Sequence, residues 1–250
     1  MHFTSFDGVR IAYRTLGEGR PLLLIHGLFS TATVNWIRYG TAKRLTDAGY
    51  RLILPDLRGH GESACPEGAE HWPHDVLARD MEALMAHLAL DPAETVVGGY
   101  SLGARTTVRM LARGMRPRAS ILAGMGLQGI VHASGRGGWY IRLIEGRGTW
   151  KRGDAYFMAE AFMKANVPNP EPIIHLLRDQ ADTPLEVLQD FDLPVLVICG
   201  RDDDDNGSAP ELAAALPQGR YREIPGTHML SVTKPDLGEG IERFLAELPG

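Results

Sequence analysis

The sequence has little of what several functional classes require. Cysteine occurs only twice in 250 residues, and Cys65 and Cys199 form no C-x-x-C pair, so we expect free thiols in a reducing compartment. The 26 basic residues are outnumbered by 31 acidic ones, and a net charge of −5 argues against a nucleic-acid partner. No apolar run approaches the ~20 residues of a membrane span. The charged start of the chain is also unlike a signal peptide, so we expect a cytoplasmic protein.

Motifs for metals and cofactors are also missing. The chain has no H-E-x-x-H motif, no phosphate-binding loop and no dinucleotide fingerprint, so we expect neither a metal nor a cofactor. The stretch GMGLQG (124–129) imitates G-x-G-x-x-G, but it lies far from the first strand-to-helix turn, where that fingerprint binds a dinucleotide.

Short apolar runs alternate with helical patterns along most of the chain. Runs typical of strands buried on both faces lie at 21–27, 50–56, 94–100, 119–125 and 194–200, and a weaker one at 220–226. Helical patterns occupy 33–48, 74–90, 102–114, 209–216 and 235–248. Asp7-Gly8 predicts a hairpin at the start. This alternation predicts an α/β domain, with a mostly parallel sheet and helices on both faces.

One long segment interrupts the alternation. Between Gly126 and Leu193 there is no buried-strand pattern, but several short helical stretches occur. A loop of roughly 65 residues would be unusually long for a compact domain. We therefore interpret residues 127–189 as an inserted helical lid, and residues 1–126 and 190–250 as the core.

The stretch GYSLG (99–103) places Ser101 at a predicted strand-to-helix junction. A serine nucleophile needs a base and an orienting acid, whereas a serine that only caps a helix needs neither. His228, after a strand-like run and a Pro-Gly turn, is the candidate base. The candidate acid is Asp203 in the loop after residues 194–200, with Asp202 second because a shift of one residue would exchange them.

A serine nucleophile also requires two backbone donors for the oxyanion. We predict the N–H groups of Leu28 and Leu102, because Gly27 lets the chain bend toward the serine and Leu102 begins the next helix. His26, which precedes Gly27, is interpreted as a residue that braces this turn by hydrogen bonds.

Five motifs occur together in the order HGLF (26–29), PDLRGHGES (55–63), GYSLG (99–103), GRDD (200–203) and PGTH (225–228). With these motifs, nearly the whole chain resembles the α/β-hydrolase fold family in its smaller, lidded branch. The resemblance implies an eight-stranded sheet with the lid after the sixth strand, and structural roles for Asp56 and Arg58. Serine at position 101 excludes the dehalogenases and most epoxide hydrolases of this fold, which use aspartate there.

The predicted function is hydrolysis of a carboxylic ester or lactone through Ser101, His228 and Asp203. The same residues also serve carbon–carbon bond hydrolysis, perhydrolysis and lyase chemistry, and a ligand receptor with little turnover is a lesser alternative. Aromatic residues in the lid favour a small apolar or aromatic ester, although six basic against three acidic residues in 128–164 leave an anionic substrate open. Candidate substrate contacts are Phe29, Trp36, Met125, Trp139, Phe157, Phe162 and Met229.

Overall fold

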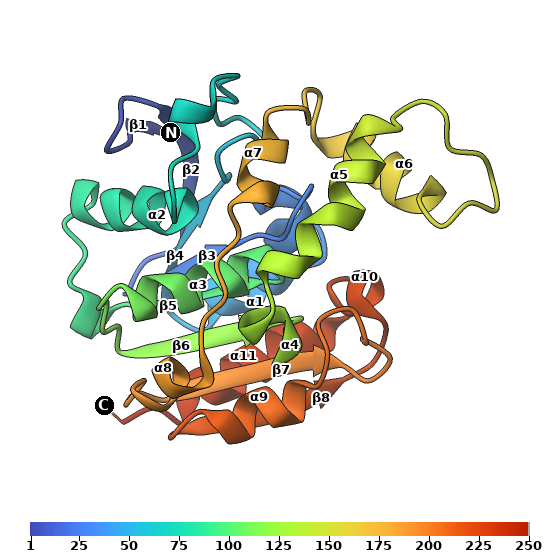
Figure 1. The fold of residues 1–250 in the computed structure, drawn as a ribbon. Helices are drawn as coiled ribbons and strands as arrows, with labels where there is room; N and C mark the ends of the chain where they lie inside the picture. Colours follow the sequence, from blue (N-terminus) through green and yellow to red (C-terminus); the bar gives the residue numbers. More distant parts are fainter. Residues whose placement is uncertain (250) are drawn as a thin grey trace.

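A twisted sheet of eight strands forms the centre of the molecule in the computed structural model, which describes residues 1–249 (Figure 1). The strands are β1 (His2–Thr4), β2 (Arg10–Leu16), β3 (Arg20–Ile25), β4 (Tyr50–Pro55), β5 (Val96–Tyr100), β6 (Ala119–Ala123), β7 (Val195–Gly200) and β8 (Gly219–Ile224). Their order is β1-β2-β4-β3-β5-β6-β7-β8. Strand β2 runs antiparallel to its neighbours β1 and β4, and strands β3 to β8 are mutually parallel. The predicted fold class is confirmed.

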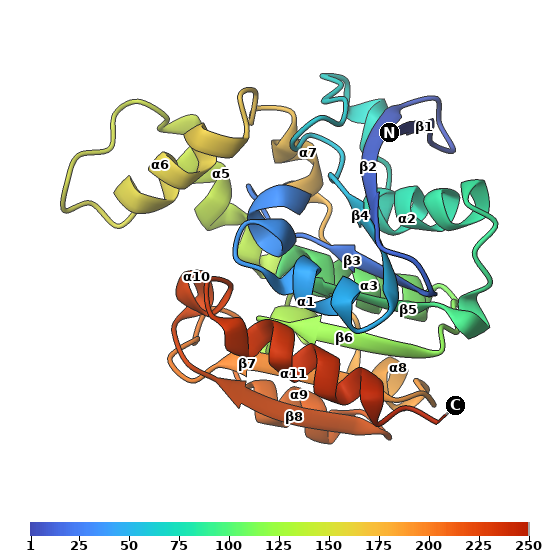
Figure 2. The same ribbon diagram turned by 180° about the vertical axis from the view of Figure 1, so that it is seen from behind.

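Helices cover both faces of this sheet. The longer ones are α1 (Thr41–Asp47), α2 (Val76–His87), α3 (Leu102–Ala112), α9 (Ala209–Ala215) and α11 (Pro235–Ala246). Helices α2, α3 and α9 lie on one face, and α1 and α11 lie on the other (Figures 1 and 2). Alternate side chains of β3 divide accordingly: Leu22 and Leu24 belong to the core cluster of α1 and α11, and Leu23 to that of α2.

The helix expected over residues 33–48 is divided in two. A short π-helical turn, η1 (Thr33–Ile37), is followed by α1, and Gly40 lies between them. Gly40 has φ 90°, a left-handed conformation that glycine adopts without steric cost. The sequence pattern of apolar residues continues across this break, which is why spacing alone predicted one helix.

The segment between β6 and β7 is helical, as expected. It contains α4 (Gln128–Val131), α5 (Gly137–Glu145), α6 (Phe157–Asn166), α7 (Ile173–Arg178) and α8 (Leu185–Gln189). Helices α5 and α6 project beyond one end of the sheet, on the side where α10 (His228–Ser231) lies (Figures 1 and 2). Leu143, Ile144 and Met163 are buried in the same cluster as Leu23 and Ile25, so the segment packs on the core.

Short 3-10 turns complete the chain: η2 (Ala69–His71), η3 (Pro92–Glu94) and η4 (Ser134–Arg136). Among the described residues, no helix has the length and apolar character needed to cross a bilayer.

Candidate active site

Four loops that carry candidate residues follow the carboxyl ends of parallel strands. Gly27 and Leu28 follow β3, Ser101 follows β5, Asp203 follows β7 and His228 follows β8. Because parallel strands end at the same edge of a sheet, their loops form one surface, and this is where open α/β sheets bind ligands.

Ser101 occupies a sharp turn between β5 and α3. Its φ of 54° and ψ of −111° are unusual for a residue with a side chain, and such strain is found at functional positions. The turn is compact because Gly99 and Gly103 lack side chains. A Cβ on Gly103 would lie 2.1 Å from the Ile25 carbonyl oxygen, and one on Gly99 would lie 2.3 Å from the Gly103 carbonyl carbon. Any side chain at either glycine would therefore force the turn apart.

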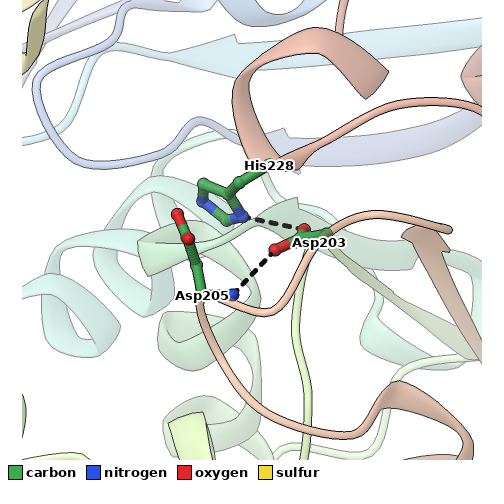
Figure 3. A group of neighbouring side chains, drawn as sticks. All are labelled: Asp203, Asp205 and His228. Atoms are coloured by element: carbon green, nitrogen blue, oxygen red, sulfur yellow. Dashed lines mark hydrogen bonds and ion pairs between the residues drawn. The ribbon is translucent and has the colours of Figure 1, made fainter.

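His228 and Asp203 form a hydrogen-bonded pair (Figure 3). His228 Nδ1 lies 2.9 Å from Asp203 Oδ2, and the Asp203 side chain is almost fully buried. The same carboxylate accepts the Asp205 N–H at 3.2 Å and faces the Cys199 thiol at 3.3 Å. Asp202 is exposed. Of the two adjacent aspartates considered, Asp203 is therefore the one that contacts the imidazole.

The electrostatics of Asp203 favour its charged form. Burial alone raises the pKa of this carboxyl, but the hydrogen bond and charge of His228, with the donors at Cys199 and Asp205, leave it below its ordinary value. Burial also raises the pKa of the Cys199 thiol, and the Asp203 charge raises it further, so the thiol keeps its proton and acts as a donor. The acid therefore remains ionised beside the imidazole.

Tyr100 connects the serine-bearing strand to the histidine-bearing turn. Its hydroxyl donates to the His228 carbonyl oxygen at 2.6 Å and also bonds Ser231 Oγ at 2.8 Å. Its ring centroid lies 5.3 Å from that of His228. Burial raises the pKa of Tyr100 well above its ordinary value, so the phenol stays a donor. Tyr100 was not predicted from the sequence, although its position directly before Ser101 was a signal.

Ser101 and His228 do not bond each other among residues 1–249. Before substrate binds, a nucleophile and its base are often too far apart for a good hydrogen bond and tighten in the reactive complex. The arrangement thus contains a bonded Asp203–His228 pair, and Tyr100 connects His228 to the strand that ends directly before Ser101.

The loop after β3 packs against the serine turn. A Cβ on Gly27 would lie 3.4 Å from the Tyr100 carbonyl oxygen and 3.5 Å from Ser101 Cβ, so the two backbones are close neighbours. Within residues 1–249, the N–H groups of Leu28 and Leu102 donate to no protein acceptor. Leu102 is the first residue of α3, where an N–H has no acceptor within the helix. Both groups are therefore free to bind an anionic oxygen.

Two buried histidines hold this loop. His26 Nδ1 lies 2.8 Å from the Gly27 carbonyl oxygen, and His26 Nε2 accepts the Leu57 N–H at 2.9 Å. His60 Nε2 accepts the Phe29 N–H at 3.0 Å. Burial lowers the pKa of His26 to about 4 and that of His60 to about 3, so both rings are neutral at pH 7. The bracing role expected of His26 is confirmed, and His60 shares it.

An open hollow of about 620 Å³ lies next to Asp205. Its lining includes Trp139, Tyr140, Arg136, Arg142 and Asp205. Asp205 also connects it to the candidate pair, since its carboxylate, an Asp203 oxygen and a His228 nitrogen lie within 4.8 Å of one another. The Tyr140 ring lies 6.0 Å from that of Phe29.

The candidate substrate contacts differ in their positions. Trp139 lines the hollow, and Phe29 is buried beside Tyr140, while Phe157 and Phe162 on α6 are half-buried. Met229 on α10 is half-exposed.

Two candidates need correction. Trp36 and Met125 have no exposed surface, and each belongs to a core cluster, Trp36 on the α1 and α11 side of the sheet. Packing accounts for both, and neither is carried into the functional proposal. An apolar side chain has the same appearance in a sequence whether it fills a core or lines a pocket.

The group formed by Asp203, Asp205 and His228 has the ligand types of a divalent-cation site. A cation there would compete with the hydrogen bond that Asp203 and His228 already make. The geometry thus suits an acid–base pair better than a metal site.

Comparisons with known proteins agree with this description. A family model described as "Alpha/beta hydrolase family" matches residues 22–237. A non-heme haloperoxidase from Rhodococcus erythropolis is 36% identical over 110 residues, which cover 44% of this chain and 38% of that protein. A non-heme chloroperoxidase from Kitasatospora aureofaciens is 34% identical over 115 residues, 44% of this chain and 38% of the relative. The matches therefore span less than half of either relative.

Solved structures resemble the whole chain. A thermophilic esterase from Thermogutta terrifontis superposes with a TM-score of 0.80 at 22% identity, covering 99% of this chain and 98% of that one. The enol-lactonase from Burkholderia xenovorans LB400 has a TM-score of 0.74 at 22% identity, covering 99% of this chain and 100% of that one. At such identities the similarity establishes the fold and leaves activity open.

Proposed function

Because this chain belongs to the alpha/beta hydrolase family, we propose that it is a serine hydrolase that cleaves a carboxylic ester or lactone with Ser101, His228 and Asp203. The observation that carries the proposal is the 2.9 Å hydrogen bond between His228 Nδ1 and buried Asp203. A base oriented by a carboxylate and a serine in a strained turn are the components that activate a hydroxyl nucleophile.

The proposed chemistry has two halves. His228 Nδ1–H donates to Asp203, which leaves Nε2 to accept the proton of Ser101. The Ser101 oxygen bonds to the substrate carbonyl carbon, the ester C–O bond breaks, and His228 returns the proton to the departing alcohol. His228 then takes a proton from water, whose oxygen attacks the acyl carbon. The bond between the Ser101 oxygen and the acyl carbon breaks, and His228 returns the proton to Ser101, which releases the acid and restores the enzyme.

The N–H groups of Leu28 and Leu102 are the proposed oxyanion donors. Both lack a protein acceptor within the described part of the chain, and the Gly27 backbone packs beside Ser101. His26 and His60 hold this loop before substrate arrives. Preorganised donors of this kind stabilise the tetrahedral intermediate without moving during the reaction.

Residues 127–189 are the proposed lid. They follow β6 and precede β7, and Trp139 and Tyr140 on α5 line the hollow beside Asp205. Apolar and aromatic walls around a few polar groups suit a small organic ester.

The test follows hydrolysis of 4-nitrophenyl esters of increasing acyl length by wild type and Ser101→Ala. We expect turnover to fall by a factor of about 10³ or more in the variant, as in serine triads generally. Asp203→Asn should lower turnover strongly, whereas Asp202→Asn, which alters an exposed neighbour, is the matched control. If Ser101→Ala kept the activity of wild type, the assignment of Ser101 as the nucleophile would be refuted.

A serine-reactive fluorophosphonate separates the alternatives if neither protein hydrolyses these esters. Labelling at Ser101 without ester hydrolysis would favour carbon–carbon bond hydrolysis or lyase chemistry. No labelling would favour a ligand receptor on a hydrolase scaffold.

The haloperoxidase relatives favour one second activity. Hydrogen peroxide could replace water in the second half-reaction, so that the acyl group leaves as a peracid. Bromide-dependent halogenation of monochlorodimedone in acetate and hydrogen peroxide tests this, and it should vanish in Ser101→Ala. Halogenation that survives in the variant would separate that activity from the acyl-enzyme.

A further inference from the structure

The hollow beside Asp205 contains positive charge without a carboxylate partner. Arg136 donates to the backbone carbonyl of Asp205, and Arg142 Nε lies 3.1 Å from the Tyr156 hydroxyl. Among residues 1–249, neither guanidinium forms an ion pair, whereas Arg147 and Lys164 of the same segment pair with Glu171 and Glu160. Two basic groups of this segment that lie away from the hollow are thus neutralised, whereas the two that line it are not.

A third arginine strengthens the positive field. Arg105, one turn after Ser101 on α3, donates to the Gly129 carbonyl oxygen at 3.0 Å and to the Gln180 side-chain oxygen. Both partners are neutral. Burial and the positive charge of Arg136 together lower the pKa of Arg105 to about 10, so the two guanidiniums repel each other. An anion between or beside them would relieve that repulsion.

Aromatic side chains hold Arg142 in place. Trp139 stacks on Tyr156 with ring centroids 4.7 Å apart, and Tyr156 lies 4.2 Å from the Trp150 ring. Tyr156, which bonds Arg142, is therefore fixed by two neighbouring rings. A guanidinium anchored through Nε presents its remaining N–H groups in a fork that fits a carboxylate.

One acidic group, Asp205, shares the hollow and would oppose an anion. Its carboxylate points toward His228 (Figure 3) and lies within 4.8 Å of a His228 nitrogen. The negative group of the hollow, Asp205, therefore lies at the end near His228. The guanidiniums of Arg136 and Arg142 also line the hollow. This polarity favours a substrate whose ester group lies at His228 and whose anionic group lies toward Arg142.

We propose that Arg136 and Arg142 form a subsite for a carboxylate carried by the ester or lactone substrate, with Trp139 and Tyr140 contacting the chain or ring between the two groups. The inference rests on the proposed function, because it assigns one end of the substrate to Ser101 and His228.

The test compares two esters of equal size: 4-nitrophenyl hydrogen adipate, which carries a carboxylate, and its neutral terminal amide. We expect kcat/KM to be about tenfold higher for the anionic ester, the effect of one charge-assisted hydrogen bond. Arg142→Gln and Arg136→Gln should each reduce this ratio toward one, and 0.5 M NaCl should reduce it in wild type. Arg152→Gln, which removes an exposed charge of the same segment outside the hollow, should leave it unchanged.

Equal kcat/KM values for the two esters in wild type would overturn the subsite while leaving the serine hydrolase intact. The subsite would also be overturned if Arg152→Gln lowered the kcat/KM ratio of the two esters as much as Arg142→Gln does. The overall charge of the lid would then act without a specific site. Tryptophan fluorescence measures the binding of both esters to Ser101→Ala, and this measurement does not depend on turnover. If the anionic ester binds Ser101→Ala more tightly than the neutral ester does, and the double variant Ser101→Ala, Arg142→Gln loses this difference, the subsite is supported. This holds even if wild type hydrolyses neither ester.

Discussion

His26 and His60 show how a buried residue's protonation state supports a loop. Their ring centroids lie 5.2 Å apart, and each ring uses an unprotonated nitrogen to accept a backbone N–H. A proton on either accepting nitrogen would remove that hydrogen bond and place a charge in the interior. The loop that presents the Leu28 N–H is therefore stable only while both rings are neutral.

We predict that the free energy of unfolding falls as the pH drops from 7 to 5. Unfolded histidine titrates near pH 6.5, but His26 and His60 resist protonation until about pH 4 and 3, so the unfolded state binds more protons in this window. The loss should be about 2 kcal/mol for each ring at pH 5. Urea unfolding at both pH values measures it.

His60→Asn should flatten this pH dependence, because only one of the two buried rings would remain. His132→Asn, at an exposed position, is the matched control and should keep the wild-type dependence. A pH dependence that is unchanged in His60→Asn would contradict the assignment of this effect to the buried ring.

At the scale of elements, the crossing of α3 over the sheet positions Ser101. Helix α3 lies so close to β3 that a methyl group on Gly103 would overlap the Ile25 carbonyl oxygen. This contact is with backbone, which cannot rotate away as a long side chain could. The close approach brings the first turn of α3, with its free N–H at Leu102, next to the loop after β3.

Gly103→Ala should therefore lower the free energy of unfolding by about 3 kcal/mol or more, because helix and strand must separate. Gly135→Ala is the control, since a Cβ there would meet no atom within 4 Å. Chemical denaturation of both variants tests the difference. Comparable stability of the two variants would show that α3 can shift without cost.

Across the whole molecule, Arg58 joins three distant segments. Its guanidinium has no exposed surface and pairs with buried Asp80 on α2 at 2.7 Å and with Asp7 in the β1–β2 turn at 2.6 Å. It also donates to the His71 carbonyl oxygen, and Ser5 donates to Asp80. The structural role that the family resemblance implied for Arg58 agrees with these contacts.

Asp80→Ala should destabilise the protein by about 3 kcal/mol, because it leaves the buried Arg58 charge with one partner fewer. Asp47→Ala, which removes an exposed partner of Lys43, should have no measurable effect. Thermal and urea unfolding of the two variants provide the comparison. A small loss in Asp80→Ala would mean that Asp7 alone compensates the charge.

The parallel sheet and most of its helices could be predicted from the sequence because they depend on local patterns. Apolar runs such as 194–200 specify strands buried on both faces, and a glycine on each side of Ser101 permits a tight turn. The break at Gly40 was missed because apolar spacing continues through it. Trp36 and Met125 were assigned to a pocket because composition does not distinguish a core from a binding site.

Contacts between distant segments required the folded chain. Tyr100 and His228 are 128 residues apart, and their hydrogen bond depends on how β5 and α10 meet. Which of two adjacent aspartates reaches His228 depends on the backbone path of one loop. The unpaired arginines of the hollow became visible only when each charge had been matched with its neighbours in space. Spacing along a chain encodes local geometry, whereas these contacts arise from packing and loop conformation, which no local pattern specifies.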